Sequence, residues 1–254
     1  MLEIDGISKH FGGLPALEEV SFRCREGMTT ALIGPNGAGK STLINCIAGT
    51  LNPDAGAIRF TGRRIDDLPC HRRPYLGIAR TFQNLALFPR LTVLENVLAG
   101  LTPEAEQSFV KSLLRLPATR HRERLLRLKA MAMLDNFGLA DKARWPASVL
   151  SYGDKKRVEM ARALVAGPRL LLLDEPVAGL NGAETARIAM EIRRLHGAGL
   201  TILLVEHDMD LVMTVSDHVV VLDGGRLIAA GAPQEIRTNP RVIEAYLGRM
   251  SVTA

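Results

Sequence analysis

Eight consecutive residues near the N-terminus have the types and spacing needed to hold phosphate groups. The segment Gly34-Pro35-Asn36-Gly37-Ala38-Gly39-Lys40-Ser41 fits the pattern G-x-x-x-x-G-K-[ST]. Glycines let backbone N–H groups turn toward phosphate oxygens, and the N-terminus of a following helix adds the positive end of its dipole. We expect Lys40 to reach the β- and γ-phosphates of a nucleotide and the Ser41 hydroxyl to ligate Mg²⁺. Thr42, which follows directly, completes the predicted phosphate contacts.

Acidic and basic side chains at the ends of two apolar runs could do the hydrolytic chemistry. Asp174 and Glu175 follow the run Leu170–Leu173. Asp174 is predicted to hold Mg²⁺ directly or through water, and Glu175 to polarise an attacking water as general base. A helix cap or a solvated turn is the alternative for this acidic pair. His207 follows the run 200–205, and it is predicted either to hydrogen-bond the γ-phosphate or to be a structural histidine.

These side chains need elements that bring them together. The apolar run Thr29–Ile33 leads directly into the glycine-rich loop, which predicts strand, loop and helix in that order. Further strands are predicted at Leu2–Asp5, Val20–Arg23, Ala57–Phe60 and Ile78–Phe82. In the second half, a helix is predicted after Gly153, and another near 183–197 lies between the two apolar runs. This β-α-β pattern indicates an α/β fold with buried parallel strands.

A helical insert with its own charge interrupts this pattern. Helical periodicity extends from Thr92 to about Gly138, with Pro103 and Pro117 as expected breaks. Residues 101–145 carry a net charge of +4, whereas the whole chain carries +5. We predict that the basic side chains form a solvated helix face. The alternative is that some of them meet anionic lipid headgroups or acidic protein loops.

Composition excludes several classes of protein. A chain of 254 residues with 47% hydrophobic content can bury a core, and three widely spaced cysteines do not form a disulfide framework. The longest stretches without charge are thirteen residues, too short for a membrane span of about 20 residues. With acidic residues at positions 3 and 5 and only 4% aromatic residues, we expect neither a signal peptide nor a nucleic-acid surface. A cytoplasmic protein is predicted.

One short segment separates this chain from kinases, GTPases and helicases with the same phosphate loop. Leu150-Ser151-Tyr152-Gly153-Asp154 resembles the L-S-G-G-Q signature of ATP-binding-cassette (ABC) ATPases. Its serine stands 23 residues before Asp174. The resemblance implies that Ser151 and Gly153, with Tyr152 and Asp154 beside them, contact ATP held by the phosphate loop of a second subunit. Tyr152 and Asp154 depart from the commonest signature.

The same resemblance implies roles for three further positions. Phe11 is similar to the aromatic residue on which adenine stacks, although a core phenylalanine is the alternative. Gln83 is similar to the glutamine that touches Mg²⁺ or water and links the nucleotide to the helical insert. Ala178-Gly179-Leu180-Asn181 takes the place of a loop that usually reads S-A-L-D, so Asn181 keeps the hydrogen-bonding shape without the charge.

Several longer segments resemble the ATPase subunits of bacterial branched-chain amino-acid uptake systems. They are 77–84, 92–97, 150–153, 178–181 and the tail 239–248. Cassettes for urea or amide uptake are similar, and the lipopolysaccharide-export ATPase shares the tail but usually keeps the common signature and an aspartate at position 181. A soluble ABC ATPase of translation or DNA repair and a P-loop small-molecule kinase are further alternatives.

The resemblance implies a complete organisation. The expected fold is a P-loop NTPase-like core with a mainly parallel sheet, an N-terminal antiparallel β part and a helical subdomain that carries the signature. The chain would be one ABC ATPase domain, with a nucleotide-binding core at about 1–90 and 160–238, a helical subdomain at about 91–159 and a helical tail at 239–254. ATP and Mg²⁺ are the implied ligands.

The implied partners are a second ABC ATPase subunit and two membrane permease subunits. A periplasmic or lipid-anchored solute-binding protein would take part indirectly, and no nucleic acid is expected. The protein would then lie on the inner face of the cell membrane. The sequence does not identify the solute, because no residue of this chain needs to touch it.

Overall fold

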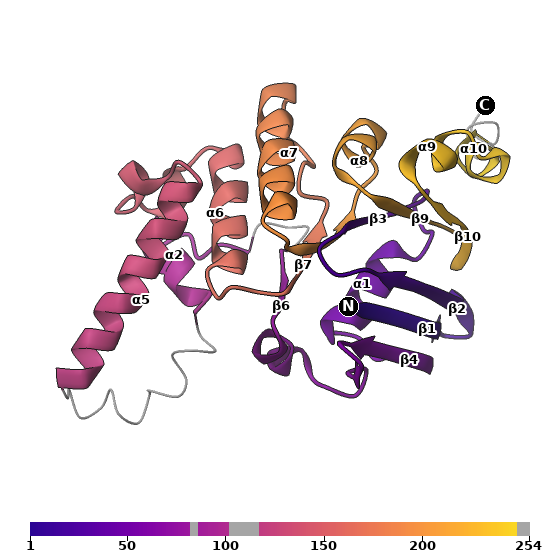
Figure 1. Ribbon diagram of the computed structural model, residues 1–254, viewed down its shortest axis with the longest axis horizontal. Coiled ribbons are helices and arrows are strands. Elements are labelled where there is room, and N and C mark those ends of the chain that lie inside the picture. Colours follow the sequence, from indigo (N-terminus) through magenta and orange to yellow (C-terminus); the bar gives the residue numbers. More distant parts are fainter. Residues whose placement is uncertain (82–85, 102–116, 248–254) are drawn as a thin grey trace.

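A six-stranded sheet forms the centre of the computed structural model, which describes residues 1–81, 86–101 and 117–247 (Figure 1). The strand order is β10-β9-β3-β8-β7-β6. The bounds are Thr29–Ile33 for β3, Ile78–Arg80 for β6, Leu170–Asp174 for β7, Thr201–Val205 for β8, His218–Asp223 for β9 and Arg226–Gly231 for β10. All neighbouring pairs are parallel except β9 and β10, which run antiparallel. The predicted α/β fold with a mainly parallel sheet is confirmed.

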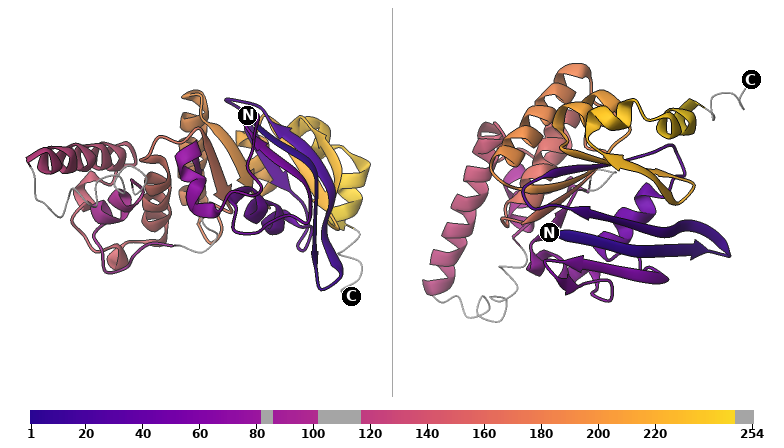
Figure 2. Two further views of the ribbon diagram at one scale, coloured as in Figure 1. Left: turned by 90° about the horizontal axis from the view of Figure 1, so that it is seen from below. Right: turned by 45° about the vertical axis from the view of Figure 1, so that its right-hand side comes forward.

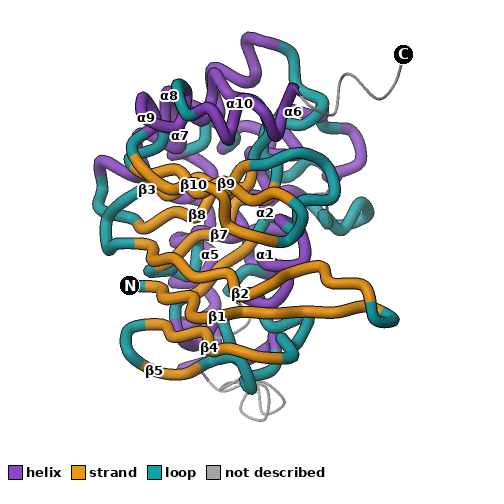
Figure 3. Tube along the Cα trace, turned by 90° about the vertical axis from the view of Figure 1, so that its right-hand side faces the viewer, coloured by secondary structure: helices purple, strands orange, loops and turns teal. Residues whose placement is uncertain are grey.

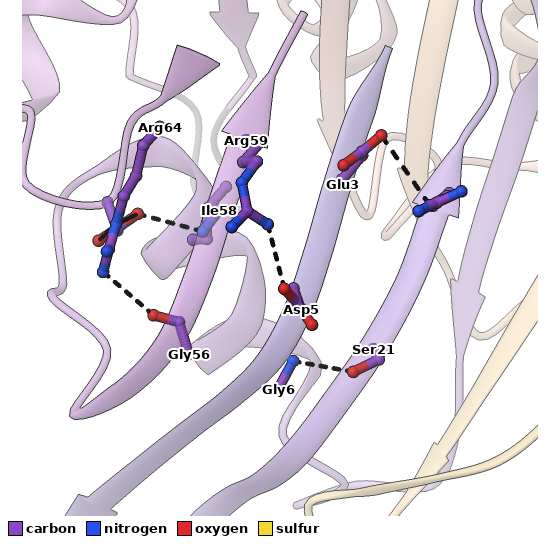
Figure 4. Close-up of polar contacts among 10 residues, drawn as sticks. Glu3, Asp5, Gly6, Ser21, Gly56, Ile58, Arg59 and Arg64 are labelled. Atoms are coloured by element: carbon purple, nitrogen blue, oxygen red, sulfur yellow. Dashed lines mark hydrogen bonds and ion pairs between the residues drawn. The ribbon is translucent and has the colours of Figure 1, made fainter. Parts of the chain in front are cut away.

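A second, antiparallel sheet lies next to it. Its order is β2-β1-β4-β5, with β1 at Leu2–Phe11, β2 at Leu14–Cys24, β4 at Ala55–Phe60 and β5 at Arg63–Arg64. Polar side chains link its strands, among them the ion pair of Arg59 with Asp5 and the hydrogen bond from Gly6 N–H to Ser21 Oγ at 2.8 Å (Figure 4). Figure 3 shows the two sheets as separate layers. The first two strands extend well beyond the short runs that the sequence predicts there.

Helix α1, at Lys40–Ala48, packs between the two sheets. Its buried Leu43, Ile44 and Ile47 contact a core that includes Leu2 from β1 and Leu32 from β3. The packing places the N-terminus of α1 directly after β3, as the phosphate loop requires. One hydrophobic cluster thus fixes the position of the loop against both sheets.

The remaining helices lie on the other side of the parallel sheet or beyond its β6 edge. The first set is α7 at Gly182–Gly197, α8 at Met209–Val215, α9 at Pro233–Arg237 and α10 at Pro240–Leu247. The second set is α2 at Val93–Ala99, α5 at Pro117–Asn136 and α6 at Tyr152–Leu164. The second set gathers at the end of the molecule away from the antiparallel sheet (Figure 2). Its core includes Val97, Leu134 and Val158 from α2, α5 and α6.

Pro117, one of the two breaks predicted in the helical insert, is the first residue of α5 as the structure describes it. Proline fits the first helical position because that residue has no intrahelical N–H bond to lose. Pro103 lies outside the described residues. The strands at 218–223 and 226–231 are not predicted, because the sequence has no chemical motif in that region.

Candidate active site

Strand register brings the predicted site residues to one edge of the parallel sheet. Val205 of β8 pairs with Leu32 of β3 on one side and with Asp174 of β7 on the other. The glycine-rich loop, the acidic pair and the segment of His207 therefore begin at the same level. This is the edge at which open α/β sheets place their ligands.

The phosphate loop needs glycine at two positions because the chain passes close to other backbone there. Gly34 has φ +148°, and a Cβ at this position would collide with the carbonyl of Leu222. Gly39 has φ +99°, and a Cβ there would lie 2.6 Å from the carbonyl oxygen of Ala16. The loop is thus held between the antiparallel sheet and the end of β9, with its N–H groups at the start of α1.

Lys40 is folded back onto this loop. Its ammonium donates to the carbonyl oxygens of Gly34 at 2.6 Å and Pro35 at 3.0 Å, and the residue is 8% exposed. Ser41, by contrast, is exposed at the start of the helix, with Thr42 half-buried beside it. The lysine is therefore positioned at the cradle where phosphate oxygens would bind.

Asp174 has the properties of a magnesium ligand. The residue is 3% exposed, and Oδ2 accepts a hydrogen bond from Arg80 at 2.9 Å. Its other oxygen, Oδ1, is buried and has no hydrogen-bond partner among the described residues. A buried carboxylate oxygen without a partner is costly, and an oxygen ligand of this kind suits Mg²⁺. The donor set of Asp174 and Ser41 therefore fits this ion.

Glu175 stands in a strained turn. Its φ is +48°, in the left-handed region, which costs roughly 1–2 kcal/mol for a non-glycine residue. Its N–H donates to the carbonyl of Val205 at 2.9 Å, so the end of β8 holds this conformation. Glu175 thus directly follows the last residue of β7 at this edge of the sheet, and its role as general base stays a prediction.

His207 is presented to solvent by a buried neighbour, Glu206. The His207 side chain is 59% exposed, whereas Glu206 is fully buried. Glu206 accepts hydrogen bonds from the N–H groups of Val177 at 3.2 Å, His207 at 3.0 Å and Asp208 at 3.4 Å. Burial raises the pKa of its carboxyl group, although these bonds oppose the shift. Glu206 thus joins the loop after Glu175 to the loop of His207.

Sequence reasoning missed Glu206. The signal was present, because a charged residue between an apolar strand and a candidate catalytic histidine is expected to be buried with partners. One of these partners, Val177, lies 29 residues away, and spacing along the chain does not reveal it.

Phe11 lies at the exposed end of β1. Half of its surface is exposed (50%), and the ammonium of Lys9 lies 5.8 Å from the ring centroid. This exposure is unlike that of a core phenylalanine and leaves a ring face for a flat base. The hairpin that follows Phe11 contains Ala16, which contacts the phosphate loop at Gly39. The hairpin that carries Phe11 is thereby in contact with the phosphate loop.

The signature segment forms the first turn of α6. The Ser151 hydroxyl caps the helix by accepting from the N–H of Asp154 at 3.1 Å, and Ser151 itself is exposed. Tyr152 is 43% exposed, and its ring packs over Gly179, where a Cβ would lie 3.5 Å from the ring. Gly153 is buried against Glu184. The segment is therefore fixed to the loop 178–181.

Asp154 has internal partners. It is 8% exposed and forms ion pairs with Lys142 at 2.5 Å and with Arg157. Burial alone would raise the pKa of this carboxyl group, but the hydrogen bonds from both cations outweigh it and hold the pKa low. These contacts favour a role in fastening α6, and a nucleotide contact by Asp154 remains a prediction.

The structure describes Asn181 but not Gln83, the two remaining predicted positions. Asn181 caps α7: its Oδ1 accepts from the N–H of Glu184 at 3.0 Å, and Glu184 Oε2 accepts from the N–H of Asn181 at 3.2 Å. An aspartate could make the same cap, so the uncharged side chain keeps the local structure. Gln83 lies outside the described residues, and its predicted contact with Mg²⁺ stays a prediction.

The site combines a phosphate loop, an acidic strand end, a following histidine and a capped signature helix. This combination defines a cassette ATPase. The family model described as ABC transporter matches residues 17–178, and the chain belongs to this family as a transporter ATPase. A second model, described as branched-chain amino acid ATP-binding cassette transporter, matches residues 226–250. Among the described residues, no helix is both long and apolar enough to cross a membrane.

Particular relatives extend this result over nearly the whole chain. The chain is 43% identical over 249 residues to the high-affinity branched-chain amino acid transport ATP-binding protein BraF of Pseudomonas aeruginosa, with 98% of each chain covered. It is also 43% identical over 251 residues to LivG of Salmonella typhimurium, with the same coverage. The solved ADP conformation of MJ1267, an ATP-binding cassette of an ABC transporter, matches with 35% identity, 98% coverage of both chains and a TM-score of 0.85.

Proposed function

We propose that this chain is the ATP-hydrolysing subunit of an importer for branched-chain or related amino acids. The observation that carries the proposal is the similarity to BraF and LivG over 98% of the chain, together with the match of the C-terminal model at 226–250. The importer would use separate permease subunits and, indirectly, a solute-binding protein. The ATPase would lie on the cytoplasmic face of the membrane, where ATP is available.

Each residue at the sheet edge has a separate role in the hydrolysis of ATP. Glu175 takes a proton from water, whose oxygen forms a bond to the γ-phosphorus while the bond to the β–γ bridging oxygen breaks and ADP leaves with that electron pair. Lys40 offsets the charge on the phosphate oxygens, and His207 holds the γ-phosphate. Ser41 and Asp174, with Gln83, would hold Mg²⁺, which supplies further neutralisation of phosphate charge.

The signature serves the nucleotide of a second subunit in this proposal. Ser151 is exposed at the N-terminus of a 13-residue helix, where a hydroxyl, backbone N–H groups and the helix dipole suit an anion. The phosphate loop of the same subunit lies at the start of a different helix, α1. A two-fold dimer with ATP between one phosphate loop and the opposite signature uses both surfaces, and either a second copy or a sister ATPase could supply the other half.

A mostly apolar groove of about 640 Å³ is the proposed permease contact. Its lining comes from the end of α1, from 70–80 and from α6, and it includes Phe88, Arg162 and Ala163. Apolar grooves with a few polar groups suit a short helix of a partner. The groove is lined by Ala79 and Arg80 of β6, so a permease segment seated there would contact this strand.

Trapping ATP in the dimer tests the proposed function. Glu175→Gln keeps the shape of the side chain but cannot take the proton, so we expect hydrolysis to be lost and a stable ATP-dependent dimer to appear on size exclusion. The variant should co-purify with its permease subunits and stop uptake of leucine, isoleucine and valine. Hydrolysis by the variant within a few-fold of the wild-type rate would contradict the role of Glu175. If the wild-type transporter takes up another solute but none of these three amino acids, the assigned substrate class is wrong.

A further inference from the structure

One arginine connects the proposed permease groove with the predicted magnesium ligand. Arg80 is the last residue of β6, and its side chain is 14% exposed. The guanidinium donates through one nitrogen to Asn45 Oδ1 at 2.8 Å and through another to Asp174 Oδ2 at 2.9 Å. Asn45 belongs to α1, the helix that begins at the phosphate loop. Arg80 therefore ties α1 and β7 together beside the catalytic edge.

The same side chain borders the groove. Arg80 and its neighbour Ala79 line it, together with Ala48 from α1 and Leu172 from β7. Ala48 and Leu172 belong to α1 and β7, the two elements that Arg80 contacts, and Ala79 belongs to β6, which carries Arg80 itself. A molecule seated in the groove would thus contact Arg80, whose guanidinium also binds Asp174.

We propose that Arg80 is a positioning residue that orients the Asp174 carboxylate and makes this orientation sensitive to the occupant of the groove. By engaging Oδ2, Arg80 leaves Oδ1, the buried oxygen without a hydrogen-bond partner among the described residues, as the metal-facing oxygen. Hydrogen bonds to a ligating carboxylate fix its rotamer and commonly change metal affinity. The coupling to the groove rests on the proposed function, but the orientation of Asp174 does not.

The competing explanation is that Arg80 and Asp174 form an ion pair that only stabilises the fold. Removing one partner of a buried pair destabilises a protein whether or not it has a further role. A loss of stability therefore does not separate the two explanations. Metal affinity does, because an ion pair of purely structural importance gives no reason for Asp174 to bind the metal less well in the folded variant.

Mn²⁺ binding by the whole ADP-bound subunit, followed by electron paramagnetic resonance, is the direct test. We expect Arg80→Gln to weaken Mn²⁺ binding by roughly 10- to 100-fold, the usual effect of removing such a partner. Arg80→Lys should restore part of the loss because it keeps the charge and one contact. ADP binding without metal should stay unchanged in both variants.

Arg162→Gln is the matched control. Arg162 also lines the groove, but its guanidinium contacts the carbonyl of Ala86 and the carboxylate of Glu159. It should lower the melting temperature without changing Mn²⁺ affinity. If Mn²⁺ affinity in folded Arg80→Gln is within twofold of wild type, or is tighter, the positioning role is wrong.

The assembled transporter tests the coupling. Wild-type Mn²⁺ affinity should differ severalfold between the free subunit and the subunit bound to its permeases, and Arg80→Gln should remove this difference. Equal affinity in both states would overturn the coupling while leaving the proposed function intact. Failure of the chain to bind the permeases would instead contradict the proposed function, and the free-subunit titration would still decide the role of Arg80.

Discussion

The carboxylate of Glu184 lies directly against the Cα of Gly153, so that a Cβ at position 153 would stand 2.5 Å from Oε1. The other carboxylate oxygen of Glu184 accepts the N–H of Asn181 at the start of α7. One side chain therefore joins the signature to the loop that follows Glu175. Within this subunit, the segment predicted to contact a partner's nucleotide is therefore held against the loop that follows the predicted general base.

Gly153→Ala should impair hydrolysis more than stability. The new methyl group would displace Glu184 and break its bond to Asn181, which costs about 1 kcal/mol of cap energy. The shifted signature should lower the ATPase rate by roughly tenfold to 100-fold, because small misplacements of contacting groups are expensive in catalysis. ATP binding by the isolated subunit should not change.

Gly182→Ala provides the comparison for this variant. Gly182 also lies in the first turn of a helix, but a Cβ there meets nothing within 4 Å. It should keep its activity and gain slightly in stability, since alanine favours helices by about 1 kcal/mol over glycine. Equal losses of activity in the two variants would argue against the Glu184 contact as the cause.

The raised pKa of Glu206 predicts a pH dependence of stability. Its pKa is higher in the folded protein than in the unfolded chain because of burial. The stability contributed by this shift is present below the unfolded pKa and is lost as pH rises through the folded pKa. The free energy of unfolding of wild type should therefore fall, relative to Glu206→Gln, as pH rises through that window.

Denaturant unfolding of both proteins across a pH series measures this difference. Glu206→Gln should also hydrolyse ATP more slowly at neutral pH, because the amide cannot accept the N–H groups of both Val177 and His207 as the two carboxylate oxygens do. A difference in unfolding free energy that does not vary with pH would contradict the assigned pKa shift.

The basic residues of α5 give a prediction about the helical insert. Arg124 and Arg127 are exposed, and Arg122 is half-buried. If the face is simply solvated, Arg122→Glu with Arg124→Glu should leave ATP binding, transport and recovery with membranes unchanged. A loss of membrane recovery that becomes more sensitive to salt would instead indicate a contact with anionic headgroups or an acidic permease loop.

Local motifs were predictable from the sequence, whereas the contacts that align them were not. The strand Thr29–Ile33 agrees with its prediction residue for residue, because an apolar run before a glycine-rich loop has few alternatives. The pairing of Arg80 with Asp174 spans 94 positions in the chain and depends on β6 lying next to β7. Single-sequence patterns carry no information on that adjacency, and the same holds for Glu184 and Gly153.

A second general limit concerns groups whose roles depend on burial. Glu206 and Asp154 are ordinary charged residues in the sequence, and only packing shows that the first is fully buried and the second is held by Lys142 and Arg157. Glu206 lies beside the predicted site residue His207, and Asp154 is itself a predicted nucleotide contact. The motifs did not show which neighbours hold the site in place.

ATPase activity in a mixture of two inactive variants tests the composite site most directly. Lys40→Ala removes the charge-assisted phosphate contact of its own subunit, and Ser151→Arg blocks the signature offered to the other subunit. Each variant alone should be inactive, with ATP binding lost in the first and nearly unchanged in the isolated second. Equal mixing should restore up to about a quarter of wild-type activity, because half of the dimers regain one of their two sites. No recovery, combined with loss of ATP binding by Ser151→Arg alone, would contradict a site shared between two subunits.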